Sequence, residues 1–148
     1  MQALEKVLPV ILAWSANREQ EVLESGEPLT PTQQQFAAES GVENIERIRL
    51  LFVDRVSQPQ DPELLQMASS VGLPLDNTAG RALGYGVEIV AGSSNQERLL
   101  RHEFRHVHQF EANGGLEVFL AIYLRSIVDY GYVDSPWEKD ARRSESGR

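Results

Sequence analysis

The chain has 148 residues, of which 41% are hydrophobic and 24% are charged, with a formal net charge of −8 at pH 7 and no cysteine. This length suits one domain with its own core, and the composition is that of a soluble globular protein. The negative charge argues against binding to nucleic acid or to anionic membranes. Without cysteine there are no disulfides and no thiolate ligands, so any metal must bind to His, Asp or Glu.

Residues 1–44 are predicted to form the N-terminal helical part of a single domain that spans residues 1–148. From residue 2 to about residue 24, apolar side chains recur at helical spacing, with Pro9 as either a kink or a first-turn residue. The apolar run from Val7 to Trp14 is too short to cross a bilayer, and no clear cleavage site follows it. A buried helix is therefore favoured over a signal peptide, and a cytoplasmic location is favoured with it.

Shorter elements are predicted next. Thr30-Pro31-Thr32-Gln33 is a capping-box sequence and begins a helix that ends at Gly41. Residues 47–56 contain a short run rich in β-formers, which predicts a central strand. Asp61-Pro62-Glu63 then begins a short helix that stops before Gly72.

The stretch from Leu83 to Val90 alternates between apolar side chains on one face and two glycines and Glu88 on the other. This pattern indicates a half-buried strand whose glycines allow another backbone to approach closely. Two interpretations are open. It is either an ordinary edge strand or an edge to which an extended peptide adds by main-chain hydrogen bonds.

Three helices and a tail are predicted for the C-terminal part. The capping-box sequence Ser94–Glu97 begins a helix that ends at Asn113-Gly114-Gly115, and Leu116–Tyr130 form a long helix that packs against it. A last short helix begins at Asp134. Residues 45–142 would thus hold the strands and the later helices, and residues 143–148 are predicted to be a frayed polar tail.

The motif His102-Glu103-x-x-His106 lies in the first of these helices. Residues four apart share one helix face, so both imidazoles can reach the same metal ion. Zinc accepts imidazole nitrogen and carboxylate oxygen, and a catalytic zinc keeps a further position for water. Glu103 would lie beside that water as a general base.

A helical wheel supports this role for Glu103. With His102 at zero and about 100° per residue, His106 lies at about 40° and Glu103 at about 100°, inside an apolar arc from about 60° to 200°. A carboxylate there is unfavourable unless it is paired or its proton affinity is raised. The polar face is predicted to hold the four remaining residues of the motif region, Arg101, Arg105, His108 and Gln109. This position excludes His108 as a ligand.

Two histidines make a poor zinc site, so a carboxylate from elsewhere must complete it. The acidic candidates that follow the helix are Glu117, Asp129, Asp134, Glu138 and Asp140. Glu138 is the best, because it lies near the start of a helix and the small Ala141 would let that helix approach the motif helix closely. Glu138 also fits a capping box with Ser135 as the cap, and motif geometry leaves both interpretations open.

Together, His102-Glu103-x-x-His106 and Glu138-x-x-Ala141 resemble the gluzincin branch of zincin metallopeptidases, particularly the small single-domain minigluzincins. The resemblance covers roughly residues 45–143 by motif matching. It implies an α+β, minimal zincin-like fold, mainly helical, with a small sheet that includes an edge strand before the motif helix, and with a C-terminal glutamate helix.

The resemblance also implies the site. In that family the two histidines and the later glutamate bind zinc, which corresponds here to His102, His106 and Glu138 as ligands of Zn2+. The glutamate after the first histidine is the general base, here Glu103, and the edge strand that aligns the substrate would lie around Leu83–Val90. Larger gluzincins carry Asp or Ser near the glutamate ligand, where this chain has Ala141. The residue that steadies the oxyanion is left open among Tyr130, Tyr132 and Arg142.

These observations predict a zinc-dependent metallopeptidase that hydrolyses a peptide or protein substrate through a water molecule activated by Glu103. One alternative is a non-catalytic zinc-binding or protein-interaction module on the same fold, which the small size and the unidentified oxyanion partner favour. A weaker alternative makes residues 102–106 a chance match in a helical interaction protein.

Overall fold

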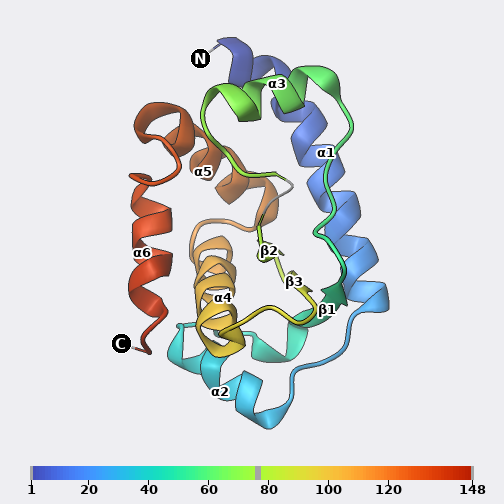
Figure 1. Cartoon of the computed structure of the whole chain (residues 1–148), viewed down its shortest axis with the longest axis vertical. Coiled ribbons are helices and arrows are strands. Elements are labelled where there is room, and N and C mark those ends of the chain that lie inside the picture. The colour runs from blue at the N-terminus through green and yellow to red at the C-terminus, as the bar shows by residue number, and fades with distance from the viewer. Residues whose placement is uncertain (1, 76–77, 148) are drawn as a thin grey trace.

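The computed structural model describes residues 2–75 and 78–147; Met1, Asp76, Asn77 and Arg148 lie outside the described residues. Within these ranges the chain forms six α-helices, one short 3-10 helix and a three-stranded sheet. In chain order they are α1 (Gln2–Ser25), α2 (Pro31–Glu39), η1 (Ile45–Arg47), β1 (Arg49–Val53), α3 (Pro62–Ser70), β2 (Gly80–Leu83), β3 (Gly86–Val90), α4 (Gln96–Ala112), α5 (Leu116–Tyr130) and α6 (Pro136–Ser144) (Figure 1). The predicted α+β class, mainly helical, is confirmed.

At two of the predicted helix starts the expected caps form. At α2 the Thr30 hydroxyl accepts a hydrogen bond from the Gln33 amide, and the Gln33 side chain accepts one from the Thr30 amide. At α3 the Asp61 carboxylate accepts from the Leu64 amide. The capping box predicted at α4 is wrong: Asn95 caps the helix in the left-handed conformation, with φ of 58°, and no side-chain cap bond forms. A capping side chain reaches the helix amides from an extended residue, which Asn95 is not.

The sheet has the order β1-β3-β2, with β1 parallel to β3 and β2 antiparallel to it. Two predictions are therefore corrected. The strand within residues 47–56 lies at an edge rather than in the centre of the sheet. The stretch Leu83–Val90 is not one strand, because Gly84 takes φ of 61° and, with Tyr85, turns the chain back between β2 and β3. Such two-residue hairpin turns need left-handed backbone, which glycine adopts without strain.

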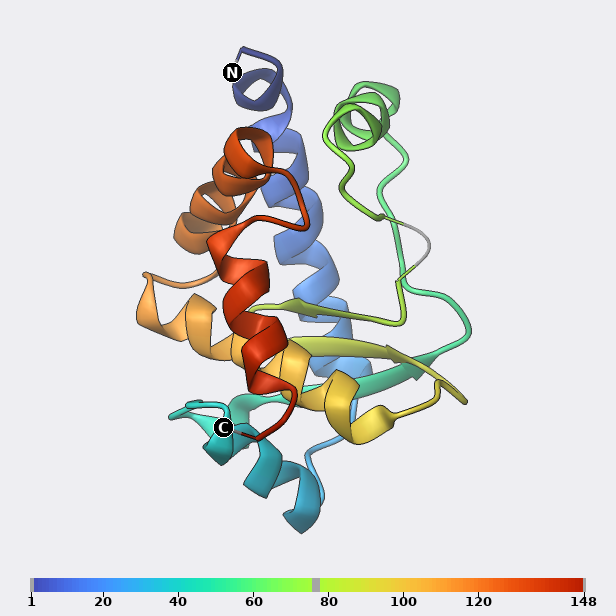
Figure 2. The same cartoon turned by 60° about the vertical axis from the view of Figure 1, so that its left-hand side comes forward.

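Helices α4 and α1 cover opposite faces of this sheet (Figure 2). A Cβ atom added at Gly80 would meet Ile89 and two α4 side chains, whereas one added at Gly86 would meet Val22 of α1. Side chains alternate along a strand, so these contacts belong to the two faces of the hairpin. Both faces of β3 are consequently buried, and Glu88, predicted on a partly solvated face, is only 1% exposed.

The apolar arc predicted for α4 forms the centre of the core. Phe104 and Val107 are fully buried, and Phe110 packs edge-on against Phe119 of α5. The predicted polar face of α4 is largely buried as well, because α2 and α6 pack over it. Gln109 there is 1% exposed, and its amide donates to the backbone of α6.

Among the helices that the structure describes, none combines the length and the hydrophobicity required to cross a membrane.

Candidate metal centre

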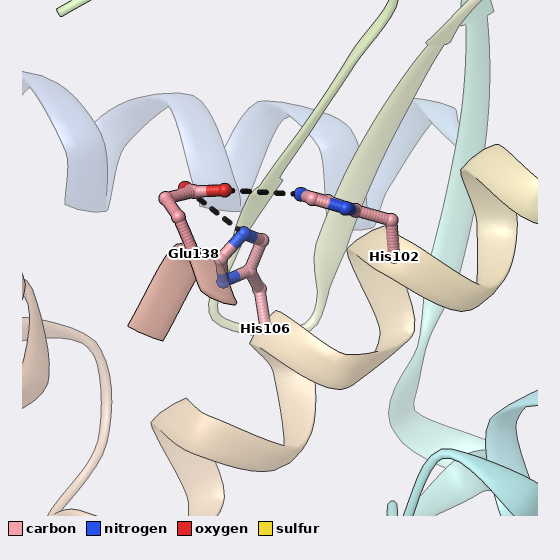
Figure 3. A group of neighbouring side chains, drawn as sticks. All are labelled: His102, His106 and Glu138. Carbon is pink, nitrogen blue, oxygen red and sulfur yellow. Dashed lines mark hydrogen bonds and ion pairs between the residues drawn. The ribbon is translucent and has the colours of Figure 1, made fainter. Parts of the chain in front are cut away.

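Helix α4 and the first turn of α6 bring together the side chains of His102, His106 and Glu138 (Figure 3). The Nε2 atom of His102 lies 3.1 Å from Oε1 of Glu138, and the Nε2 atom of His106 lies 3.2 Å from Oε2. One ligand atom from each of the three residues lies within 4.8 Å of the others. The sequence placed these residues in one group, and the structure assembles it.

Local packing of α6 positions Glu138. Ala141, three residues later, is fully buried, which is consistent with a close approach of α6 to α4. The capping box at Ser135, which was the competing prediction, does not form. The Ser135 hydroxyl contacts the Ser126 hydroxyl at 2.7 Å instead of capping the helix. The Glu138 carboxylate is thereby left to face the two histidines.

The outer nitrogen of each imidazole also has a fixed partner. Nδ1 of His102 lies 2.7 Å from a carboxylate oxygen of Glu145, and Nδ1 of His106 lies 2.8 Å from the amide oxygen of Gln109. The orientation of Gln109 is set because its nitrogen donates to the Trp137 carbonyl and to the Asp140 carboxylate. Carboxylate and carbonyl acceptors of this kind fix the tautomer of metal-binding histidines.

These contacts have an electrostatic consequence. A neutral imidazole that carries its proton on Nδ1 presents a lone pair at Nε2. Both Nε2 atoms point at the Glu138 carboxylate, so lone pairs and negative charge would repel one another unless a proton or a metal cation lies among them. The three side chains are thus arranged around a place for positive charge.

The pKa values in the metal-free centre agree with this arrangement. Burial alone would lower the pKa of His102, but the hydrogen bond with Glu138 and the nearby carboxylates of Glu103 and Glu145 outweigh it and raise the pKa to about 9. The pKa of His106 is raised by the same carboxylate of Glu138 despite its burial. Burial would raise the pKa of Glu138, yet hydrogen bonds from both histidines and Tyr123 bring it well below its ordinary value.

Glu103 lies beside these three side chains, but the environment of its carboxylate differs from that of Glu138. Its side chain is buried, as the wheel predicts, and no hydrogen bond to its carboxylate occurs among the described residues. Burial therefore raises its pKa, although the charges of His102 and His106 oppose this. Gly80 allows β2 to pass close by, because a Cβ atom there would lie 3.3 Å from Cγ of Glu103.

A cavity of about 120 Å³ adjoins the centre. Its polar end is formed by the histidines, Glu103 and Glu138 together with Tyr123 and Tyr132, and all four residues of β2 line its side. Apolar residues of α1, α5 and the segment before β2 complete the wall, among them Ile11, Trp14, Leu73, Leu120 and Leu124. The buried carboxylate and the three potential ligands thus share one cavity.

The other predicted candidates lie elsewhere. Nδ1 of His108 lies 3.0 Å from the Gly41 carbonyl oxygen, outside the centre, as its helical phase predicts. Asp140 pairs with Arg105. Tyr130 is 60% exposed, and Arg142 donates to the Val133 carbonyl.

Sequence reasoning missed Glu145 and Gln109. The tail was predicted to fray from residue 143, but α6 continues through Ser144, and the Glu145 side chain is only 16% exposed between Arg98 and His102. Helical spacing could have predicted the position of Glu145, because it lies two turns after Glu138 and therefore on the same helix face. Gln109 lies three residues after His106 and was assigned to the polar face.

The donor set fits a metal ion such as zinc. Two ligands of a tetrahedral zinc, each about 2.0–2.1 Å from the metal, lie about 3.3 Å apart. The histidine nitrogens lie 3.1 Å and 3.2 Å from the two different oxygens of the Glu138 carboxylate, which is close to this spacing, and one ligand atom from each of the three residues lies within 4.8 Å of the others. The protein therefore contains a His-His-Glu group that could hold a metal ion.

Comparisons of the chain with protein-family models, with curated proteins and with solved structures give no match. The function is therefore inferred from this centre and its cavity.

Proposed function

We propose that this protein is a zinc-dependent metallopeptidase with a minimal zincin-like fold, similar to the gluzincins. His102, His106 and Glu138 would hold zinc, and Glu103 would be the general base. The observation that carries the proposal is the position of Glu103, which is buried in the cavity that the three ligands share and accepts no hydrogen bond from any described residue. A structural metal site needs no such carboxylate.

When bound, zinc supplies a Lewis acid and lowers the pKa of water towards neutrality. The raised pKa of Glu103 suits the remaining proton transfers, because a base works best when its pKa lies near the working pH. Glu103 accepts the proton of the attacking water and returns it to the leaving amine. The Tyr123 hydroxyl, 2.5 Å from Glu138, keeps the carboxylate ligand in place.

The edge of β2 offers a place for the substrate backbone. The Val90 amide donates to the Ala79 carbonyl, so in this antiparallel pair alternate residues from Ala79 bond to β3, and Gly80 and Ala82 direct their backbone groups outward. An extended peptide can add to such an edge through main-chain hydrogen bonds. In this proposal the strand that aligns the substrate is therefore β2, Gly80–Leu83, which precedes most of the stretch Leu83–Val90 predicted from the sequence.

Tyr132 is the best candidate to donate to the oxyanion. It lines the cavity, and burial and the carboxylates of Glu138 and Glu103 raise its pKa, so its hydroxyl stays protonated at neutral pH. Tyr123 is already bonded to Glu138, and Tyr130 and Arg142 lie outside the cavity lining. The turn between α5 and α6 thus supplies the group that the sequence left open.

One observation favours the alternative, a non-catalytic zinc module: the ligands join α6 to α4, so a metal there would also fasten the C-terminal helix. A peptide-hydrolysis assay distinguishes the peptidase from the non-catalytic module. Zinc-reconstituted wild-type protein is incubated with a random peptide library, beside Glu103→Gln, which keeps all three ligands. Cleavage by wild type and its loss in zinc-loaded Glu103→Gln supports the peptidase. Zinc binding by both without any cleavage supports the module.

A further inference from the structure

Arg81 is a partly buried arginine to which no carboxylate of the described residues binds directly. Its side chain extends from β2 into the wall of the cavity beside the metal centre. Its two terminal nitrogens donate to main-chain carbonyls, those of Ser57 and Leu75. The nearest acidic neighbour on the sheet, Glu88, already accepts two hydrogen bonds from Arg18.

Some hydrogen-bond donors of the Arg81 guanidinium group have no partner among the described residues. A guanidinium group has five N–H donors, and two hydrogen bonds from this one are formed among the described residues. Its Nε atom has no hydrogen-bond partner among the described residues and is not fully buried, so at least this donor faces open space. That space is the cavity, since Arg81 is one of its lining residues.

The charges around Arg81 also favour a negatively charged ligand. Glu88 and Glu21 both pair with Arg18, so among these charged residues Arg81 is the cation without a direct ion pair among the described residues. Burial lowers the pKa of Arg81, which shows that its charge is poorly solvated. A desolvated cation gains most from a ligand that brings a negative charge and accepts hydrogen bonds.

We propose that the cavity binds its substrate through a carboxylate held by Arg81. The proposal rests on the peptidase function and narrows its substrate class to peptides with an acidic side chain or a free C-terminal carboxylate near the scissile bond. Arg81 and Glu103 both line this cavity, so a substrate held by Arg81 would share the cavity with the proposed base. The Trp14 ring, 6.0 Å from the guanidinium carbon, adds a flat apolar wall beside it.

Position along β2 explains why this residue can select substrates. Gly80 and Ala82 present backbone groups at the edge of β2 that does not pair with β3, where the Gly80 carbonyl accepts a hydrogen bond from the Thr78 hydroxyl, and Arg81 lies between them. Residues of a strand are about 3.3 Å apart, so a peptide aligned on this edge passes Arg81 within one or two residues of the bond that faces Glu103. The chain as a whole, with a net charge of −8, would repel an acidic peptide, which makes one local cation decisive.

The test uses zinc-loaded protein and matched peptides. Each peptide is made with Glu or Gln at one position and with a carboxylate or an amide at its C-terminus, and kcat/KM is measured for all. A charged hydrogen bond of about 1.5–3 kcal/mol predicts cleavage about tenfold or more faster for one acidic form. The Glu/Gln pair detects a side-chain carboxylate, and the acid/amide pair detects the C-terminus. Equal rates within both pairs would overturn the proposal without touching the peptidase function.

Variants assign the effect to Arg81. Arg81→Met keeps the length of the side chain and removes the charge, and it should abolish the acidic preference mainly through KM. Arg81→Lys should restore part of it. The matched control is Arg49→Met on β1, because Arg49 also donates to main-chain carbonyls but lies outside the cavity lining. An acidic preference that survives in folded, zinc-binding Arg81→Met contradicts the assignment.

A binding measurement separates this inference from the peptidase function. Benzoate and its neutral analogue benzamide are titrated into metal-free protein and followed by NMR. Benzoate should bind to wild type and to Arg49→Met, more weakly to Arg81→Met, and more tightly than benzamide to wild type. This result would support the carboxylate site even if no peptide is cleaved. Benzoate binding that is unchanged in Arg81→Met would overturn it.

Discussion

The metal-free centre predicts an unusual dependence of folding stability on pH. His102 has a pKa of about 9 in the folded protein against 6.5 for the unperturbed side chain. Because the folded-state pKa is raised, the folded protein binds more protons than the unfolded chain between these two values. The stabilisation is complete below pH 6.5 and is lost as the pH rises through 9.

The magnitude follows from the shift. At about 1.4 kcal/mol per pKa unit, raising the pKa from 6.5 to about 9 corresponds to about 3 kcal/mol of folding free energy. The lowered pKa of Glu138 describes the other side of the same interaction, so the two contributions are not added. His102 is 14% exposed at its side chain, which limits solvent screening.

Urea unfolding of chelator-treated protein, at pH values from below 6.5 to above 9, measures this loss directly. The free energy of unfolding should fall by about 3 kcal/mol across the range. In Glu138→Gln, which keeps the shape of the side chain without its charge, most of the dependence should disappear. A free energy of unfolding that is flat or rises in metal-free wild type would refute the assignment of a shared positive charge to this centre.

Three further predictions concern the residues around the centre. Glu103→Gln should retain zinc and lose peptide hydrolysis by a factor of about 10² or more, measured as kcat on zinc-loaded protein; full activity there would exclude Glu103 as the base. Glu145→Ala should weaken zinc binding by about 10- to 100-fold in a competition titration, because it removes the acceptor at Nδ1 of His102, and Glu145→Gln should recover part of the loss. Unchanged affinity in both would mean that Glu145 only packs against the histidine. Tyr132→Phe should lower kcat by about 10²-fold with little change in KM, since its hydroxyl is needed only as negative charge develops, and an equal rise in KM would place it in substrate binding.

Chemical requirements made part of the site predictable from sequence. His102 and His106 are fixed by helical spacing, and the buried position of Glu103 follows from the apolar arc. Glu138 was the best of the acidic candidates because Ala141 allows close packing, and the resemblance to the gluzincin motif, rather than geometry, favoured it as a ligand over a capping residue. The structure removed the competing capping interpretation, since the Ser135 hydroxyl contacts α5 instead of the helix amides.

The remaining features depend on tertiary contacts that no local pattern contains. The alternation from Leu83 to Val90 fits a strand, but Gly84 and Tyr85 also fit a hairpin turn, and the antiparallel pairing of β2 with β3 decides between them. Gln109 has the phase of a polar-face residue and is buried only because α6 covers that face. Glu145 has the helical phase of Glu138, but its burial comes from contacts with Arg98 and His102, which the local sequence does not contain.

The central claim is that His102, His106 and Glu138 hold zinc. Elemental analysis of wild type and Glu138→Ala, purified side by side and reconstituted with zinc, tests it most directly. The proposed site predicts about one zinc per chain in wild type and a marked loss in the variant. Wild-type protein that takes up no zinc, or a Glu138→Ala variant that keeps as much as wild type, would contradict the proposed centre.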